Sequence, residues 1–144
     1  MARILLIERD LELALNIKFW LDAQFHLTLP ISDECVATRL LPFCRFDLYV
    51  IGLPLQNSSA LSMCQEICRC VDSPLIFALF EQETIAEFEQ LIDAGLSGYL
   101  TKPIDLRELS ARLRALLRRA YSYNKRAASR RAGDISIGHL PVDV

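Results

Sequence analysis

The residues best suited to chemistry stand directly after four short apolar runs of the chain. Glu8, Arg9 and Asp10 follow the first run, and Lys102 follows the last, whereas a run between them ends at Gly52. If these runs are parallel strands of one sheet, their carboxyl ends meet at one edge, where ligands and reactive groups gather in such sheets. Carboxylates and an ammonium group can bind a metal ion or a phosphate there. No Ser/His/Asp or Cys/His grouping falls at these ends, which argues against a hydrolase.

The cysteines form a second candidate group, of which Cys64, Cys68 and Cys70 are the closest together. Five cysteines in a chain without an export signal predict free thiols. The group lacks the C-x2-C spacing of zinc sites, and both histidines are far away in sequence. Cys64 and Cys68 share a helical face with Leu61 and Val71, so we expect core packing and no metal. A redox role for Cys70 stays open.

Apolar runs alternate with helical patterns along the chain. This alternation predicts a parallel sheet covered by helices on both faces and joined by right-handed crossovers. Asp10 is expected to cap the first helix, Ser32 or Asp33 the second, and Gly95 to end the fourth. The strands are expected at residues 4–7, 25–29, 48–51, 75–80 and 99–101, and the helices at 10–23, 33–41, 60–71, 81–94 and 105 to about 120.

Length and composition set the class of protein. The chain has 144 residues, 52% of them hydrophobic, which suits one ordinary domain with a normal core. Phe19, Trp20 and Phe25 are expected in or near that core. Apolar runs are too short to span a bilayer, and the first residues lack the pattern of a signal peptide. We therefore expect a soluble, cytoplasmic protein without a membrane partner.

Charge is distributed unevenly although the formal net charge is −2. Residues 1–106 hold 7 Lys/Arg and 15 Asp/Glu, whereas residues 107–131 hold 9 Lys/Arg and a single acid, Glu108. The basic stretch is either an interaction surface or a solvated helix face that runs into a linker. We divide the chain into a domain over 1–120, a basic linker over 121–133, and the start of a further domain over 134–144.

Several segments together resemble the receiver domain of response regulators, over roughly residues 2–120. The matching segments are RILLIERD, FDLYVIGLPL, SPLIFALF and, most specifically, DAGLSGYLTKPIDLRELSARLRALLRR. The resemblance implies a flavodoxin-like α/β fold, a doubly wound (βα)5 parallel sheet of five strands in the order 2-1-3-4-5. The last segment is similar to regulators with an OmpR/PhoB-type winged-helix output domain. ISIGHLPVDV looks like the first strands of that DNA-binding domain.

The chain departs from the receiver pattern at most of the functional positions. Receivers bind Mg²⁺ with two acids after the first strand and with the phosphoacceptor Asp after the third. Here Arg9 replaces the second acid, and Gly52 occupies the phosphoacceptor position. The position of the Thr or Ser hydroxyl falls on Leu79 or Phe80. The resemblance therefore implies a pseudo-receiver with no catalytic residue, no metal and no cofactor.

Two receiver positions keep their residue types, Lys102 and the switch aromatic Tyr99. We expect Glu8, Arg9 and Lys102, beside Asp10, to form a polar cluster in the degenerate acidic pocket; the alternative is a solvated Lys102. Phe80, turned inward, would fill the space that Tyr99 uses during switching in active receivers. Tyr99 is therefore expected in one fixed rotamer, although ordinary aromatic packing explains it as well.

The resemblance also implies a two-fold dimer face made by the fourth helix, fifth strand and fifth helix. Acids of the fourth helix would meet arginines of the fifth across the dyad, with an apolar set beside them; the alternative is arginines that only solvate a surface helix. The predicted residues of this face are Glu83, Glu87, Asp93, Leu96, Leu106, Leu109, Arg112, Leu113, Arg114 and Arg118.

These features favour a regulatory, non-enzymatic domain of a DNA-binding transcriptional regulator. It would act without aspartyl phosphorylation, as a homodimer that controls DNA binding through a C-terminal domain. The alternative is a stand-alone protein-interaction adaptor with a receiver fold and no DNA-binding role; an enzyme on the same fold is the least favoured reading.

Overall fold

The computed structural model describes residues 1–81 and 85–134, with side chains described for residues 1–81 and 86–121. Five parallel strands form one sheet in the order β2-β1-β3-β4-β5, which confirms the predicted doubly wound fold. The strands are β1 (Arg3–Ile7), β2 (Leu27–Ile31), β3 (Leu48–Gly52), β4 (Ile76–Phe80) and β5 (Gly98–Thr101). The helices are α1 (Leu11–Asp22), α2 (Glu34–Leu40), α3 (Ala60–Cys70), α4 (Ile85–Asp93) and α5 (Leu106–Asp134).

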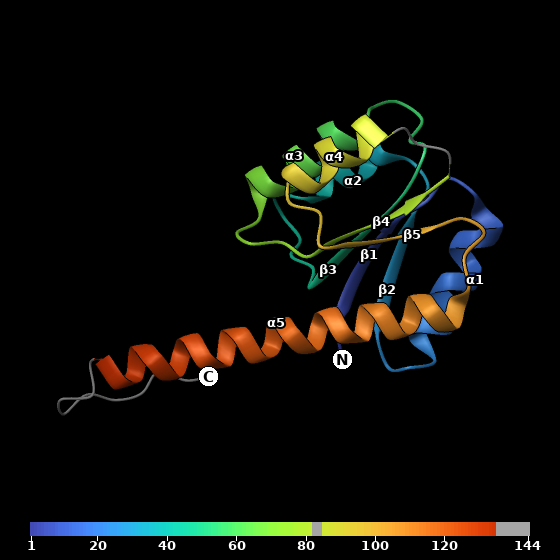
Figure 1. Cartoon of the computed structure of the whole chain (residues 1–144). Coiled ribbons are helices and arrows are strands. Elements are labelled where there is room, and N and C mark those ends of the chain that lie inside the picture. Colours follow the sequence, from blue (N-terminus) through green and yellow to red (C-terminus); the bar gives the residue numbers. More distant parts are fainter. Residues whose placement is uncertain (82–84, 135–144) are drawn as a thin grey trace.

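The sheet is a central layer between two helical layers. Figure 1 shows α2, α3 and α4 over one face of the sheet and α1 and α5 over the other. Successive strand residues point to opposite faces, so Ile4 and Leu6 pack toward α1 and α5, whereas Leu5 and Ile7 pack toward the other three helices. β3 and β4 are buried along their whole length. This double burial explains why their sequences are continuous apolar runs.

Side-chain caps begin the first three helices where the sequence predicts them. Asp10 accepts a hydrogen bond from the backbone of Leu13 at 3.3 Å, and Asp33 accepts one from Cys35 at 2.8 Å. Ser59 caps α3. These oxygens satisfy amide groups that have no partner inside the first helical turn. α4 is described from Ile85, and residues 82–84 of the expected helix lie outside the described part.

The prediction for β2 is two residues too early, and the core predictions for Phe19 and Phe25 are wrong, whereas Trp20 lies near the core as predicted. Phe25 has a positive φ of 68° in the turn that ends α1, where His26 donates its backbone N–H to Leu21. Phe19 and Phe25 are 80% and 83% exposed, and Trp20 is partly buried. Phe25 and His26, the first two residues of the expected strand, belong to this turn. The buried stripe of α1 consists of Ala14, Ile17 and Leu21, which directs Phe19 to solvent.

The last helix is longer than predicted. It continues through residues 121–133, which we expected to be a linker, and reaches Asp134. The assignment of a linker and a further domain is still a prediction, since residues 135–144 lie outside the described part. Among the helices of the described residues, none combines the length and apolar character needed to cross a membrane.

Asp22 ties α1 to the edge strand β2. Its carboxylate accepts hydrogen bonds from Lys18 Nζ at 2.6 Å and from the backbone of Thr28 at 3.0 Å, and Lys18 Nζ also donates to the Thr28 carbonyl. Burial opposes ionisation of Asp22, but these hydrogen bonds outweigh it and hold the pKa of Asp22 below its ordinary value. The ionised carboxylate therefore contributes to stability.

Asp22→Ala should lower the free energy of unfolding by about 1–2 kcal/mol at pH 7, because two hydrogen bonds to a charged group are lost. The native carboxylate has the lower pKa, so its contribution is complete above the ordinary pKa of about 4 and disappears as the pH falls through the lowered value. Urea unfolding at pH 7 and at about pH 3 measures the difference. Asn16→Ala on the exposed side of α1 is the control; an equal loss at both pH values would contradict the assignment.

Candidate functional site

The carboxyl ends of the strands bring Glu8, Gly52 and Lys102 together, as the sequence predicts. Glu8 follows β1 and is 1% exposed, and its Oε2 accepts a hydrogen bond from the backbone of Asp10 at 3.1 Å. Its own backbone N–H donates to Ile31, which holds the residue in line with the sheet. A charged carboxylate at such a depth requires a compensating partner.

Lys102 is that partner. Its Nζ lies 3.0 Å from Oε1 of Glu8 and donates a hydrogen bond to the Leu53 carbonyl at 2.9 Å. Within the described residues Oε1 of Glu8 accepts no aligned hydrogen bond, so the contact is an attraction of charges. The expected Glu8–Lys102 pairing is confirmed, and the solvated Lys102 is wrong, because only 14% of its side chain is exposed.

Gly52 leaves the space that this pair occupies. A Cβ atom on Gly52 would lie 1.9 Å from Oε1 of Glu8 and 2.5 Å from its Cδ. The carboxylate of Glu8 therefore fills the volume that a side chain at position 52 would take. The sequence shows that Gly52 carries no nucleophile, but not that an acid from β1 stands in its place.

Arg9 and Asp10 do not join this pair through their side chains. Arg9 is exposed, and no ion pair or hydrogen bond links it to Glu8 or Lys102 among the described residues. The predicted cluster of three is thus a pair, since the side chain of Arg9 extends toward solvent. Asp10 uses its carboxylate as the cap of α1.

The Mg²⁺ that the resemblance implies does not fit these residues. The shallow pocket over the pair has a volume of about 360 Å³, and its acids are accompanied by Arg9 and by Lys102, which already neutralises Glu8. Mg²⁺ prefers several carboxylate and water oxygens in octahedral array. In residues 1–81 and 86–121, no three His, Cys, Asp or Glu side chains are grouped to hold a metal ion. The pocket is lined by Glu8, Arg9, Asp10, Pro54, Gln56, Glu81 and Lys102.

Phe80, and not Leu79, stands beside the switch aromatic. Leu79 packs on the side of α1 and α5, whereas Phe80 packs on the side of α4. The Phe80 ring lies 5.8 Å from that of Tyr99 and 5.5 Å from that of Phe88, and Phe88 lies 4.7 Å from Tyr99. Edge-to-face contacts at such distances are favourable. They hold Tyr99, 39% exposed, against two rings; its expected single rotamer is still a prediction.

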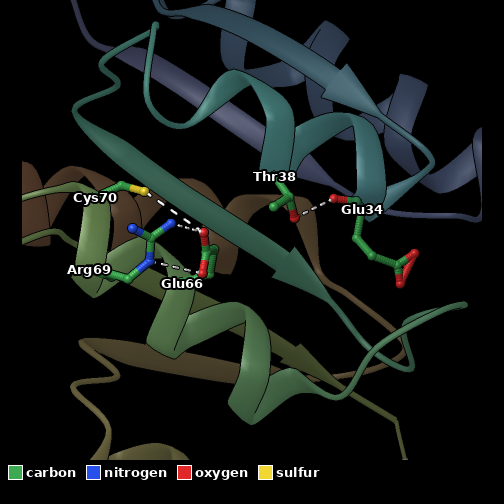
Figure 2. Close-up of polar contacts among 5 residues, drawn as sticks. All are labelled: Glu34, Thr38, Glu66, Arg69 and Cys70. Atoms are coloured by element: carbon green, nitrogen blue, oxygen red, sulfur yellow. Dashed lines mark hydrogen bonds and ion pairs between the residues drawn. The ribbon is translucent and has the colours of Figure 1, made fainter.

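Glu34 is a second buried acid near the site, which the sequence analysis missed. It is 2% exposed at the start of α2, and its Oε2 accepts a hydrogen bond from the backbone of Asn57 at 2.8 Å. Figure 2 shows its backbone carbonyl bonded to Thr38 and its carboxylate directed away from that residue. Glu34 thus fastens the loop after β3 to α2. The only indication of Glu34 in the sequence was its place in the first turn of a helix, where an acid is favourable.

The cysteines follow their predicted core role only in part. Cys64 is buried, and burial raises its pKa to about 11, so its thiol is inert. Cys68 is exposed and donates weakly to the Ala94 carbonyl, because it lies at the rim of the face shared with Cys64. Cys70 is partly buried with its thiol against Glu66, which is also bonded to Arg69 (Figure 2).

The predicted dimer face is not a single surface. Leu109 and Leu113 are 1% exposed and pack against the sheet inside the protomer, which corrects their assignment to a face between protomers. Arg112 and Arg114 lie on nearly opposite sides of α5, about 160° apart, because successive residues of a helix are rotated by about 100°. Arg114 and Arg118 line a pocket at the amino ends of the strands. Glu83 lies outside the described residues. The predicted face is therefore reduced to Glu87, Asp93, Leu96, Leu106 and Arg112.

Comparison with known proteins supports the receiver resemblance. No family model matches the chain. It is 33% identical over 119 residues to "Response regulator ArlR" of Staphylococcus epidermidis, covering 83% of this chain and 54% of that protein. It is 31% identical over 119 residues to "Transcriptional regulatory protein SpaR" of Bacillus subtilis, covering 83% and 53%. The chain thus spans about half the length of these relatives.

A solved structure gives the same result for the fold. A CheY-like response regulator receiver domain protein from Methanospirillum hungatei superposes with a TM-score of 0.82. The two chains are 14% identical, and the match covers 85% of this chain and 98% of that one. At this identity the match establishes the shared fold.

Gly52→Ala should lower the free energy of unfolding by about 2–4 kcal/mol, because the new methyl group forces a buried carboxylate away from its cation. In a Glu8→Ala background, the same substitution should cost much less, since the colliding atoms are gone. Urea unfolding of the wild type, both single variants and the double variant measures this coupling. An equal cost of Gly52→Ala in both backgrounds would show that Glu8 does not occupy the space.

Proposed function

This chain carries a receiver domain of two-component response regulators, and from that premise we propose that it acts without aspartyl phosphorylation. We propose further that it is a non-enzymatic regulatory module, and that it forms a homodimer which controls DNA binding by a C-terminal domain.

The placement of Glu8 in the space beside Gly52 carries the proposal. Phosphorylation of a receiver requires an aspartate at the position of Gly52, in contact with a metal ion and a lysine. Here the lysine is held by Glu8, and Arg9 opposes a cation at the metal position. In an unphosphorylated receiver, the lysine lies beside the carboxylate of the phosphoacceptor aspartate. Here Glu8 supplies that negative charge to Lys102. The pair is therefore complete without a phosphoryl group.

The aromatic contacts support a single state. Switching of a receiver requires a vacancy into which the aromatic of β5 can move. Phe80 takes up room beside Tyr99, and Phe88 contacts it from α4. A receiver without these movements would present its α4-β5-α5 surface in one arrangement.

Charge and length support a role in transcription. α5 leads out of the domain and carries the basic stretch over residues 107–131 (Figure 1). The relatives are about twice as long as the matched segment, and one of them is named as a transcriptional regulatory protein. A dimer of the receiver would place two DNA-binding domains on repeated half-sites.

The stand-alone adaptor is the second candidate, and one surface favours it. Leu11, Leu15 and Phe19 form an exposed row along α1 at a spacing of four residues. Such a row on the outer side of a helix suits a protein partner. An adaptor would bind through this row and need no output domain.

Incubation with acetyl phosphate and Mg²⁺ should add no phosphoryl group to the chain, as measured by intact-mass spectrometry. Gly52→Asp alone should also stay unmodified while Glu8 and Arg9 remain, since Glu8 occupies the space and Arg9 opposes the metal ion. The triple variant Glu8→Asp/Arg9→Asp/Gly52→Asp restores the acidic residues of the receiver pattern and is the positive control. A hydroxylamine-labile phosphoryl adduct on the wild-type chain would contradict the proposal.

Sedimentation velocity without any phosphodonor should show a dimer at about 50 µM, since no phosphoryl group is needed to form the face. Arg112→Glu on the exposed side of α5 should shift the chain toward the monomer. Arg39→Glu on α2, which packs over the other end of the sheet, makes the same charge change and should leave the dimer intact. A monomeric wild type at this concentration would argue against the dimer while leaving phosphorylation independence to the mass measurement.

A further inference from the structure

A larger pocket lies at the pole of the sheet opposite the Glu8–Lys102 pair. Its volume is about 530 Å³, and it is bounded by the amino ends of β1 and β4, by the loop before β3 and by α5. Figure 1 shows the first residue of the chain beside the middle of α5, at this pole. The volume is in the range of sites for small organic ligands. Nothing in the receiver mechanism uses this pocket.

The apolar part of the pocket lining, its floor, consists of Phe46, Leu75 and Leu117. Phe46 is 7% exposed, and its ring contacts Tyr49 edge-on at 5.8 Å, with the guanidinium of Arg3 over the ring at 5.5 Å. Leu75, directly before β4, and Leu117 of α5 are partly buried and pack against the core. A flat apolar group placed against Leu75 and Leu117 would gain apolar contact area.

Three arginines surround the floor. Arg45 comes from the loop before β3, and Arg114 and Arg118 come from one side of α5, four residues apart. In residues 1–81 and 86–121, none of the three forms an ion pair with an acidic side chain. Asp47 is the acid among the lining residues, and its Oδ2 is already bonded to the backbone of Arg3 at 2.8 Å. The rim therefore holds an excess of positive charge.

His26 adds a hydrogen-bond donor to the lining of the pocket. Its Nδ1 accepts a hydrogen bond from the backbone of Ala2 at 3.2 Å, so the neutral ring carries its proton on Nε2. Burial and the chain's amino group hold the pKa of His26 below its ordinary value, which keeps the ring neutral at pH 7. The pocket thus offers the neutral imidazole of His26 as a hydrogen-bond donor, together with the three guanidinium groups at its rim.

We propose that this pocket binds a small organic phosphate with a flat apolar body, the chemistry of a nucleoside monophosphate. Guanidinium groups bind phosphate oxygens in pairs, which suits them to the charged end of such a ligand. The apolar floor receives the base. The ligand would contact α5, the helix that leads toward the basic stretch, and so gives the domain an input independent of the vacated phosphorylation site.

Isothermal titration calorimetry on the full chain tests this with adenosine monophosphate, adenosine and inorganic phosphate. The monophosphate should bind with a dissociation constant below about 1 mM, and the two fragments should each bind at least about tenfold more weakly. If inorganic phosphate binds as tightly as the monophosphate, the pocket recognises a bare anion. That result would overturn the proposal that the apolar floor binds the base.

Arg45→Ala/Arg114→Ala should weaken monophosphate binding by at least about tenfold, because two charge-assisted contacts are lost. Arg39→Ala/Arg107→Ala removes the same charge from α2 and from the first turn of α5 and is the matched control. Amide NMR of both variants confirms the fold, and shifts at His26, Phe46 and Leu75 on titration locate the ligand. Equal losses in both variants, shifts elsewhere, or no binding by the wild type would each overturn the proposal.

Discussion

A carboxylate that is buried away from water needs a cation or hydrogen-bond donors to offset its lost hydration, and this constraint organises the pole that carries the strand ends. Glu8 is taken out of water by β1 and by the loops around it, so Lys102 must approach it. Lys102 in turn holds the Leu53 carbonyl, which belongs to the loop after β3. One charge pair thus joins the ends of β1, β3 and β5. Glu34 fastens the far part of the same loop through the backbone of Asn57.

The placement of Glu8 beside Gly52 shows how the fold can keep its architecture with a glycine at the end of β3. Removal of an acid from the end of β3 would leave Lys102 without its partner and would leave a cavity beside it. A glutamate that reaches across from β1 fills the cavity and meets the lysine. In this arrangement a side chain at position 52 would collide with the carboxylate of Glu8, so the two cannot occupy the same volume unless Glu8 moves. The packing at Gly52 and the Glu8–Lys102 pair therefore depend on each other.

The sequence predicts those features that depend on local pattern. The runs of β1, β3 and β4 are apolar throughout because both faces are buried, and the expected caps Asp10 and Asp33 lie at the starts of α1 and α2. The predicted position of the edge strand β2 is too early because Phe25 belongs to a turn, which hydrophobic periodicity does not indicate. The Glu8–Lys102 pair was predictable from strand ends and charge. The filling of the Gly52 space and the contact of Glu34 with Asn57 were not, since both depend on distances between distant segments.

The two poles of the sheet differ in how their charges are paired. A ligand shifts a conformational equilibrium only by its different affinity for the two states. At the carboxyl ends of the strands, Lys102 already lies against the carboxylate of Glu8. At the neighbouring surface, Phe80 and Phe88 pack against the ring of Tyr99. The pole at the amino ends of the strands differs, because Arg45, Arg114 and Arg118 form no ion pair there within the described residues. Unpaired cations beside an apolar floor gain from an added anion, so binding energy for control is available at this pole and on α5.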